Sequence, residues 1–346
     1  MNKPGPSFNN CVLFGGSGFI GLHLARHLLD SSLADKIWLA DIRAPRGELF
    51  PANIQQMLAS GKVEYLEVDV RRKIEHAGLP DRAELVVNLA AVHREPGHQP
   101  HEYYETNLYG AENVCAWAEE AGCLRVVFTS SIAPYGPSEE PRDENSLPVP
   151  RTPYGGSKLA AEKIHLAWQR GAGERRLLIV RPGVVFGPGE GGNVTRLVRA
   201  VLGRYFVYTG NQGTRKAGGY VKELCRTITW ALERLNNGPA GVILYNFTMN
   251  PPASVAEFVE GIQLTAGKRR LVPAVPYRLL LAGSYVIEAL ARPLGIRQPV
   301  SPVRVKKLVF SNHIRAAWLK SQGYDYQYTL EQALADWRDE LPRDWS

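Results

Sequence analysis

The sequence predicts an α/β protein built on a doubly wound parallel sheet, with helices covering both faces of the sheet. Short apolar runs typical of buried strands alternate along the first half of the chain with longer stretches whose apolar residues recur at helical spacing. A glycine-rich turn joins the first run to the first helical stretch, a connection found in sheets of this kind. The length of 346 residues is sufficient for such a sheet and a second, smaller domain.

Six apolar runs are predicted to be the strands of this sheet: residues 11–14, 36–41, 63–70, 85–91, 125–131 and 177–181. The clearest helical stretches between them are residues 19–30, 103–121 and 154–170. Parallel sheets bind ligands at the carboxyl ends of their strands. The residues at those ends are Gly15, Asp41, Asp69, Ala90 and Ser131, so one site can use all of them.

The second half of the chain is less regular. After Arg181 the sequence is richer in glycine and proline, and helical stretches recur at residues 193–203, 219–235, 254–266 and 329–340. We therefore expect one domain over residues 8–182. A smaller, partly interleaved domain is expected over most of residues 183–346, with some of its segments returning to the sheet.

The composition is that of an ordinary globular protein, with 45% hydrophobic and 22% charged residues. The formal net charge is +7, but the basic residues occur in short, scattered runs, so we expect a solvated surface and no nucleic acid partner. The four cysteines show no metal-ligand or redox spacing, and no apolar signal region is found at the N-terminus. We therefore expect no metal and a cytoplasmic location.

One segment, residues 275–296, is rich in leucine, alanine and valine. Arg278, Glu288 and Arg292 interrupt it, so it does not have the pattern of a membrane-spanning helix. It is expected to be a buried or amphipathic helix, and a helix lying on a membrane surface is the alternative.

The glycine-rich turn contains Gly15, Gly18 and Gly21. The N-terminus of the following helix offers free N–H groups and the positive end of a dipole, which together favour a phosphate. Glycine lets the backbone approach a pyrophosphate closely and lets the helix pack on the strand. Because the turn follows a predicted strand and opens a predicted helix, we expect it to bind a dinucleotide.

Asp41 ends the second predicted strand about 20 residues after this turn. A carboxylate there can accept hydrogen bonds from the ribose hydroxyls of adenosine and would repel a 2′-phosphate. NAD is therefore favoured over NADP. Arg43 and Arg46 leave NADP open, because an arginine can accommodate the 2′-phosphate.

Tyr154 and Lys158 lie four residues apart, and on a helix they share one face. A cation beside a phenol favours phenolate and lowers the pKa of the tyrosine. The pair can then remove a proton from a sugar hydroxyl, or return it, as hydride moves. Ser131 at the end of a preceding strand can hydrogen-bond the same oxygen.

Together these motifs resemble the extended short-chain dehydrogenase/reductases of the NAD-dependent epimerase/dehydratase group. The matching segments are Gly15–Gly21, Asp69-Val70, Asn88–Ala91, Thr106-Asn107, Thr129–Ser131 with Tyr135-Gly136, Pro153–Lys158 and Arg181–Gly189. The resemblance covers residues 11–225 well and is loose beyond. It implies a Rossmann-type domain followed by a small domain that binds a nucleotide-sugar.

The resemblance also assigns roles to individual residues. The residues assigned to catalysis are Ser131, Tyr154 and Lys158. Cofactor binding falls to Gly15, Gly18, Phe19, Ile20, Gly21, Asp41, Arg43, Asp69, Val70, Leu89, Ala90, Ala91, Asn107, Ser130, Tyr154, Lys158, Arg181, Gly183 and Val184. Substrate contacts fall to His93, Ser131, Asn193, Arg215 and Lys216, although Asn193 could equally be a helix N-cap.

Two departures from the family pattern bear on the substrate. Ser131-Ile132-Ala133 replaces the Thr-Asp-Glu of the 4,6-dehydratases, so the acid and base for removing water are missing. Lys216 stands where the family has an arginine, with Arg215 adjacent, and the late Arg-Pro-Gly-Asp motif is absent. Lysine can meet a diphosphate as a point charge but lacks the bidentate fork of arginine.

The resemblance implies an NAD-dependent nucleotide-sugar C4 epimerase, most readily for a UDP-sugar. A nucleotide-sugar 4-keto reductase using NAD(P)H would employ the same three catalytic residues. The apolar segment at 275–296 adds a hydroxysteroid-dehydrogenase-like oxidoreductase, and a non-catalytic nucleotide-sensing regulator is a further alternative. The helices at residues 103–121 and 154–170 are expected to lie on one face of the sheet. In the family, such helices pair across a homodimer; Val114, Trp117, Ile164 and Trp168 are compatible with that contact, and core packing explains them equally.

Overall fold

The central sheet has seven parallel strands in the order β11-β7-β5-β4-β1-β2-β3. The structure is a computed structural model and describes residues 8–75, 78–95, 97–209, 212–291 and 312–346. The strands are β1 (Phe8–Phe14), β2 (Ala34–Asp41), β3 (Val63–Glu67), β4 (Leu85–Asn88), β5 (Arg125–Thr129), β7 (Arg176–Pro182) and β11 (Val242–Phe247). The chain extends the sheet from β1 first through β2 and β3, then from β4 outward. This reversal confirms the doubly wound Rossmann-type fold.

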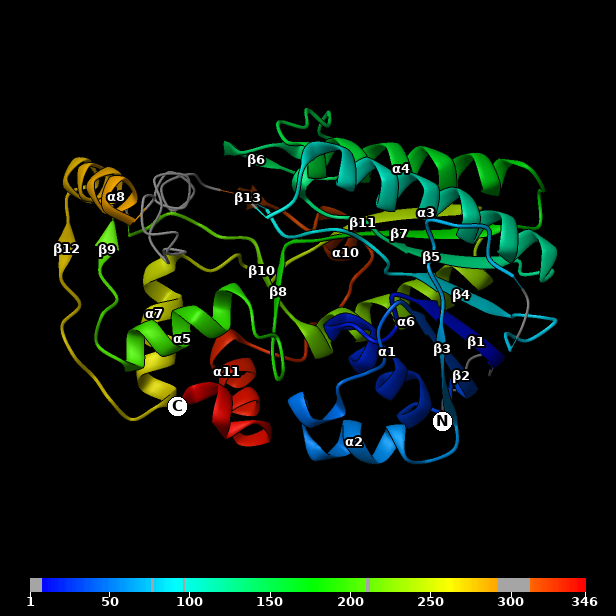
Figure 1. The fold of residues 1–346 in the computed structure, drawn as a ribbon, viewed down its shortest axis with the longest axis horizontal. Coiled ribbons are helices and arrows are strands. Elements are labelled where there is room, and N and C mark those ends of the chain that lie inside the picture. The colour runs from blue at the N-terminus through cyan, green and yellow to red at the C-terminus, as the bar shows by residue number, and fades with distance from the viewer. Residues whose placement is uncertain (1–7, 76–77, 96, 210–211, 292–311) are drawn as a thin grey trace.

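Helices cover both faces of the sheet (Figure 1). α1 (Phe19–Asp30) and α6 (Val221–Asn237) lie on one face, and α3 (Pro100–Glu120) and α4 (Pro153–Arg170) pack together on the other. Successive residues of β1 point to opposite faces, because Leu13 belongs to the first core and Val12 to the second.

The two helices α3 and α4 lie on one face of the sheet, as the sequence predicted. Four of their apolar residues were compatible with either a dimer contact or core packing, and the structure shows core packing. Val114, Trp117 and Trp168 are buried in the core between these helices and the sheet, and Ile164 packs against it. Their helical spacing turns them toward the strands, which bury them more completely than a partner would.

The second half of the chain forms a smaller lobe and also completes the sheet. α6 and β11 return to the sheet, whereas α5 (Asn193–Leu202), α7 (Val255–Thr265), α8 (Tyr277–Ala291) and α11 (Leu330–Glu340) build the lobe at one side (Figure 1). Short parallel pairs link the segments: β8 (Val184–Phe186) with β10 (Gly218–Tyr220), β9 (Tyr208–Thr209) with β12 (Ala274–Val275), and β6 (Ser138–Arg142) with β13 (Asn312–Ile314). Shorter helices are η1 (Gly47–Leu49), α2 (Ala52–Leu58), η2 (Ala133–Tyr135), α10 (Ala317–Ser321) and η4 (Pro342–Trp345).

The apolar segment predicted at 275–296 forms α8 over Tyr277–Ala291, and residues 292–296 lie outside the described part. Its outer side is exposed, so of the two expected forms the buried helix is wrong, whereas the amphipathic form is not contradicted. Within the described ranges, no helix combines the length and apolar character needed to cross a bilayer.

Candidate active site

The glycine turn between β1 and α1 packs closely against its neighbours. Gly15 has φ +75°, and a Cβ there would lie 2.6 Å from the backbone nitrogen of Ala90. A Cβ on Gly21 would lie 2.4 Å from the carbonyl oxygen of Gly16, where the helix passes the turn. Side chains are therefore excluded at Gly15 and Gly21, and the backbone of the turn is open to a ligand above it.

Ser17 is a site residue that the sequence argument missed. Its Oγ is buried, and within the described chain no hydrogen-bond partner is found for it. α1 begins after Gly18, which provides no side-chain cap, so the first N–H groups of the helix are also available. A phosphate oxygen would accept hydrogen bonds from both, so these residues fit the pyrophosphate of a dinucleotide.

Asp41 lies at the end of β2, beside this turn. Its carboxylate accepts hydrogen bonds from the backbone nitrogen of Ser17 at 3.2 Å and of Arg43 at 3.4 Å. Burial raises the pKa of Asp41, and these hydrogen bonds oppose the rise. The carboxylate is therefore held at the position expected for a ribose contact, next to the phosphate site.

Three predicted cofactor residues have side chains engaged elsewhere. The buried amide of Asn107 accepts from Val92 N at 2.9 Å and donates to Ser157 Oγ at 2.8 Å, so it positions the loop after β4. The Asp69 carboxylate binds the guanidinium of Arg71 at 2.7 Å. Arg181 is buried in an ion pair described below.

The remaining predicted cofactor residues surround this turn or follow the strand ends. Gly183 lies directly after β7, and a Cβ there would be 2.1 Å from the carbonyl oxygen of Ala217. Val70 is buried and its carbonyl accepts from Asn113 at 2.8 Å. The others are Phe19 and Ile20 in α1, the exposed Arg43 after β2, Leu89, Ala90 and Ala91 after β4, and Val184 in β8.

The predicted catalytic hydroxyls meet at the carboxyl end of β5. Ser131 follows this strand, and its hydroxyl interacts with the phenol of Tyr154 in the first turn of α4. Burial raises the pKa of Tyr154 to about 12, and the Ser131 hydroxyl opposes the rise. Thr152 caps α4 through Gly155 N at 3.1 Å, which fixes the start of the helix that carries Tyr154.

Lys158 lies one turn further along α4 and is only 2% exposed. Its Nζ lies 4.4 Å from the centre of the Phe128 ring in β5. Burial lowers the pKa of Lys158 to about 7, and the charge of Glu162 opposes this change.

The expected electrostatic effect of this lysine on Tyr154 is wrong. We predicted that Lys158 would lower the pKa of Tyr154, whereas that pKa is raised. The reason is burial of the phenol, the largest contribution to the pKa of Tyr154, while Lys158 Nζ lies over the Phe128 ring of β5.

A buried polar network supports this corner of the sheet, and sequence reasoning missed it. Glu162 accepts from Ser130 Oγ at 2.6 Å and from Arg181 Nε at 2.8 Å, and its other oxygen lies 2.6 Å from Arg181 Nη2. Arg181 Nη1 also donates to the Tyr135 hydroxyl at 2.7 Å. The available signal was Glu162 itself, an acid on the same face of α4 as Lys158 and Tyr154.

The predicted substrate residues lie in the smaller lobe and on the loop after β4. Asn193 is the first residue of α5 and its Oδ1 accepts from Arg196 at 2.5 Å. The interpretation of Asn193 as the N-cap is wrong, because Gly192 holds that position. The backbone nitrogen of Thr195 instead donates a hydrogen bond to Glu190 Oε2 at 2.9 Å.

Arg215 and Lys216 lie on the segment leading into β10. An Arg215 Nη1 donates to the carbonyl of Pro252, and the backbone of Lys216 donates to Ala253 at 3.0 Å. Burial lowers the pKa of Lys216. His93 is exposed on the loop after β4.

The glycine turn, the ribose carboxylate and the Ser-Tyr-Lys group are the features by which the chain can be compared with known proteins. The model of the NAD dependent epimerase/dehydratase family matches residues 11–246. This chain belongs to that family. It is therefore an NAD-dependent enzyme of the short-chain dehydrogenase/reductase type, as the sequence predicted.

Individual relatives in the epimerase family cover nearly the whole chain. A 4-epimerase of N-acetyl-alpha-D-glucosaminyl-diphospho-ditrans,octacis-undecaprenol from Escherichia coli O157:H7 is 31% identical over 331 residues, covering 94% of this chain and 93% of the relative. A 3beta-hydroxysteroid-dehydrogenase/decarboxylase from Arabidopsis thaliana is 27% identical, covering 94% of this chain and 77% of the relative. A UDP-glucuronic acid 4-epimerase from Bacillus cereus, in complex with NAD, has a similar fold with a TM-score of 0.71 at 18% identity, covering 97% of this chain and 100% of that one.

Proposed function

We propose that the protein is a sugar 4-epimerase that acts on a glycosyl diphosphate with tightly held NAD. The observation that carries this proposal is the placement of Ser131 at the end of β5 beside Tyr154 of α4, the helix that also carries the buried Lys158. The comparisons support it, because relatives that act at C4 include one for a lipid-diphosphate sugar and several UDP-glucose 4-epimerases.

In this proposal Tyr154 takes the proton from the C4 hydroxyl while Ser131 hydrogen-bonds the same oxygen. Bound NAD supplies the hydride acceptor, and its positive charge in the oxidised form favours phenolate over phenol. Lys158 binds the nicotinamide ribose and so holds the nicotinamide next to C4 of the sugar. The 4-keto sugar then rotates in the site. Tyr154 returns the proton and C4 regains hydride on its other face, so the reaction consumes no cofactor.

The diphosphate is assigned to the basic segment before β10. Arg215 and Lys216 stand adjacent there, and a diphosphate would satisfy the positive charge of each. A UDP-sugar and a polyprenyl-diphosphate sugar present the same glycosyl diphosphate, so both are candidate substrates.

The test is to incubate purified protein, without added cofactor, with UDP-N-acetylglucosamine, UDP-glucose or polyprenyl-diphosphate N-acetylglucosamine. Proton NMR of the sugar after the reaction should show the C4 epimer for at least one of these substrates. Comparison of turnover between the three substrates identifies the carrier. If the protein instead consumes NAD(P)H stoichiometrically on a 4-keto sugar, or oxidises a sterol, epimerisation is not its function.

A homodimer and a cytoplasmic location belong to the same proposal. Helix α3, which packs against α4, presents Tyr104 and Tyr109 to solvent at 41% and 54% exposure, and these are suited to a symmetric contact. The described cysteines are all free and buried thiols, in keeping with a reducing compartment. Sedimentation equilibrium of the purified protein measures the oligomeric state.

A further inference from the structure

The outer side of α8 is an exposed apolar surface. Leu279 is 66% exposed and Val286 is 59% exposed. Ala282, which lies between them, and Ala289, which follows Val286, are exposed as well. Their spacing of three to four residues aligns them in one stripe along the helix. Tyr285 and Ile287 flank this stripe at 50% and 39% exposure. Apolar residues gathered in this way on a monomer mark an interaction surface.

The other side of α8 is less exposed. Ser284 is buried and Leu280 and Leu281 are half-buried. The chain before α8 is held by the pairing of Ala274 with Tyr208 and of Val275 with Thr209. This pairing fixes the chain that leads into α8, and the stripe lies on the more exposed side of the helix.

The charge of the surrounding sequence identifies the kind of partner. Residues 261–311 contain nine Lys and Arg and a single acid, Glu288, which is a net charge of +8. The whole chain has a formal net charge of +7, so the remainder is slightly acidic. A large basic excess thus lies in the segment that contains the exposed apolar helix.

We propose that α8 lies on an anionic membrane surface, with its apolar stripe inserted at the interface and the exposed Arg278 at the lipid headgroups, attracted by the net positive charge of this part of the sequence. Its 15 residues span about 22 Å, which is shorter than the roughly 30 Å hydrocarbon core, so the helix lies in the interface rather than crossing it. A second copy of the chain fits this surface less well, because a two-fold contact would bring two segments of net charge +8 together.

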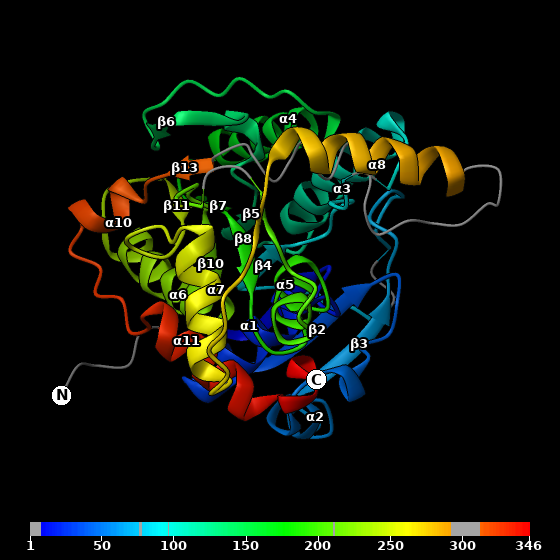
Figure 2. The same ribbon diagram turned by 90° about the vertical axis from the view of Figure 1, so that its left-hand side faces the viewer.

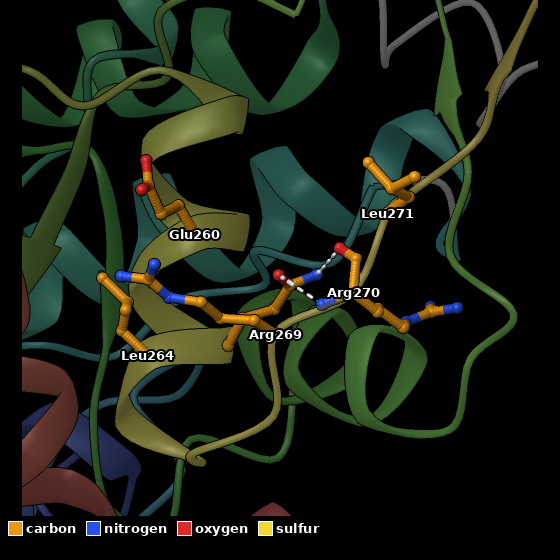
Figure 3. Close-up of a pocket in the computed structure, with 6 residues that line it drawn as sticks. Glu260, Leu264, Arg269, Arg270 and Leu271 are labelled. Carbon is orange, nitrogen blue, oxygen red and sulfur yellow. Dashed lines mark hydrogen bonds between the residues drawn. The ribbon is translucent and has the colours of Figure 1, made fainter.

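The tertiary arrangement agrees with this orientation. Figure 2 views the molecule from the side of the smaller lobe and shows α8 and the extended chain before it running across the front. That chain begins at a shallow pocket lined by Glu260, Gln263, Leu264, Arg269, Arg270 and Leu271 (Figure 3). Gln263 fixes the backbone of Arg270 through two hydrogen bonds of 3.1 and 3.3 Å, while Leu271 is 96% exposed.

If α8 docks on a membrane, the candidate active site comes close to any sugar whose diphosphate is attached to a membrane lipid. In this respect the inference rests on the proposed function. The surface can nevertheless be tested without substrate. Purified protein is floated on a density gradient with vesicles of phosphatidylcholine and phosphatidylglycerol in equal parts, and separately with phosphatidylcholine alone. The wild type should float with the anionic vesicles, and less so at high salt.

The decisive variant is Leu279→Asp combined with Val286→Asp, which places two charges in the stripe. Its partition coefficient for anionic vesicles should fall by about tenfold or more. Leu147→Asp is the matched control, because Leu147 is 74% exposed on the loop before α4 and should leave binding unchanged. Circular dichroism checks that all variants are folded.

The inference is overturned if the wild type does not float with anionic vesicles, or if the double variant floats as well as the wild type. It is also overturned if the double variant dissociates a dimer while vesicle binding is retained, because the stripe would then be an interface between copies. Turnover of a water-soluble UDP-sugar separates the two proposals: its absence in the wild type contradicts the proposed function on that substrate and leaves vesicle binding to be judged independently.

Discussion

Replacing Glu162 by alanine tests whether the buried network behind the candidate site holds that corner of the sheet together. The side chains of Glu162 and Arg181 are 2% and 5% exposed, and their closest oxygen and nitrogen are 2.6 Å apart. Removing the carboxylate leaves the guanidinium buried without its counter-charge and also removes the acceptor for Ser130. Breaking a buried pair in this way costs about 3–5 kcal/mol of the free energy of unfolding. A protein with a total of about 5–15 kcal/mol would lose a large part of its stability.

The assay is equilibrium unfolding in urea followed by circular dichroism, on wild type and Glu162→Ala. Glu64→Ala is the matched control, because Glu64 pairs with Lys36 at 2.6 Å with both side chains exposed, at 49% and 39%. An exposed pair contributes about 0–1 kcal/mol. A double variant, Glu162→Leu with Arg181→Met, should recover much of the loss because neither charge remains buried.

The reasoning is refuted if Glu162→Ala is no more destabilising than Glu64→Ala. It is also refuted if the double variant is less stable than Glu162→Ala, since the cost would then come from lost packing rather than from an unpaired charge.

Four further results are expected. Tyr154→Phe should abolish turnover, because the phenol that takes the proton is gone, while NAD binding measured by calorimetry is kept; turnover near the wild-type rate would contradict the assigned role. Asp41→Ala should reduce the preference for NAD over NADP, because the carboxylate that repels a 2′-phosphate is removed, and an unchanged ratio of the two Kd values would contradict this. Gly15→Ala should destabilise the protein by more than about 1 kcal/mol in urea, and by more than Gly61→Ala, because both glycines have positive φ but only the Cβ at Gly15 meets another atom within 4 Å; equal losses would refute the close approach. Since the pKa of Lys158 is lowered to about 7 from about 10.4 in an unfolded chain, the unfolded state binds more protons between these values, and stability of the cofactor-free protein should rise with pH across that window. In Lys158→Met this rise should be smaller by up to about 1.4 kcal/mol per pH unit in urea titrations at pH 7.5 to 9.5, and an identical slope would show that Lys158 is charged when folded.

The sheet and its glycine turn could be predicted because both are recorded locally in the chain. An apolar run followed by Gly15 and a helical stretch indicates strand, turn and helix within about twenty residues. Strand limits were less certain, and β3 and β5 end at Glu67 and Thr129, before the predicted ends. β11 was missed because its apolar run lies in the irregular second half, where only the pairing with β7 distinguishes an added sheet strand from a strand of the smaller lobe.

The candidate site was predicted as a set of residues rather than as a geometry. Ser131, Tyr154 and Lys158 were found from residue type and spacing, and the effect of the Ser131 hydroxyl on the pKa of Tyr154 agrees with that interpretation. The position of Lys158 against Phe128 was not predictable, because helical spacing defines a face but not the direction in which a long, flexible side chain folds.

The sequence by itself determined the α/β fold, the glycine-rich turn, the acid at the end of β2 and the set of residues proposed for catalysis. It did so because strand alternation, glycine spacing and the helical repeat are local properties of the chain. Only the tertiary structure decided that Glu162 neutralises Arg181, that Ser17 Oγ is buried with no partner among the described residues, and that α8 exposes its apolar stripe. The physical reason is that burial and pairing depend on which distant segments come together, and an apolar helix has the same sequence whether protein, solvent or lipid covers its outer face.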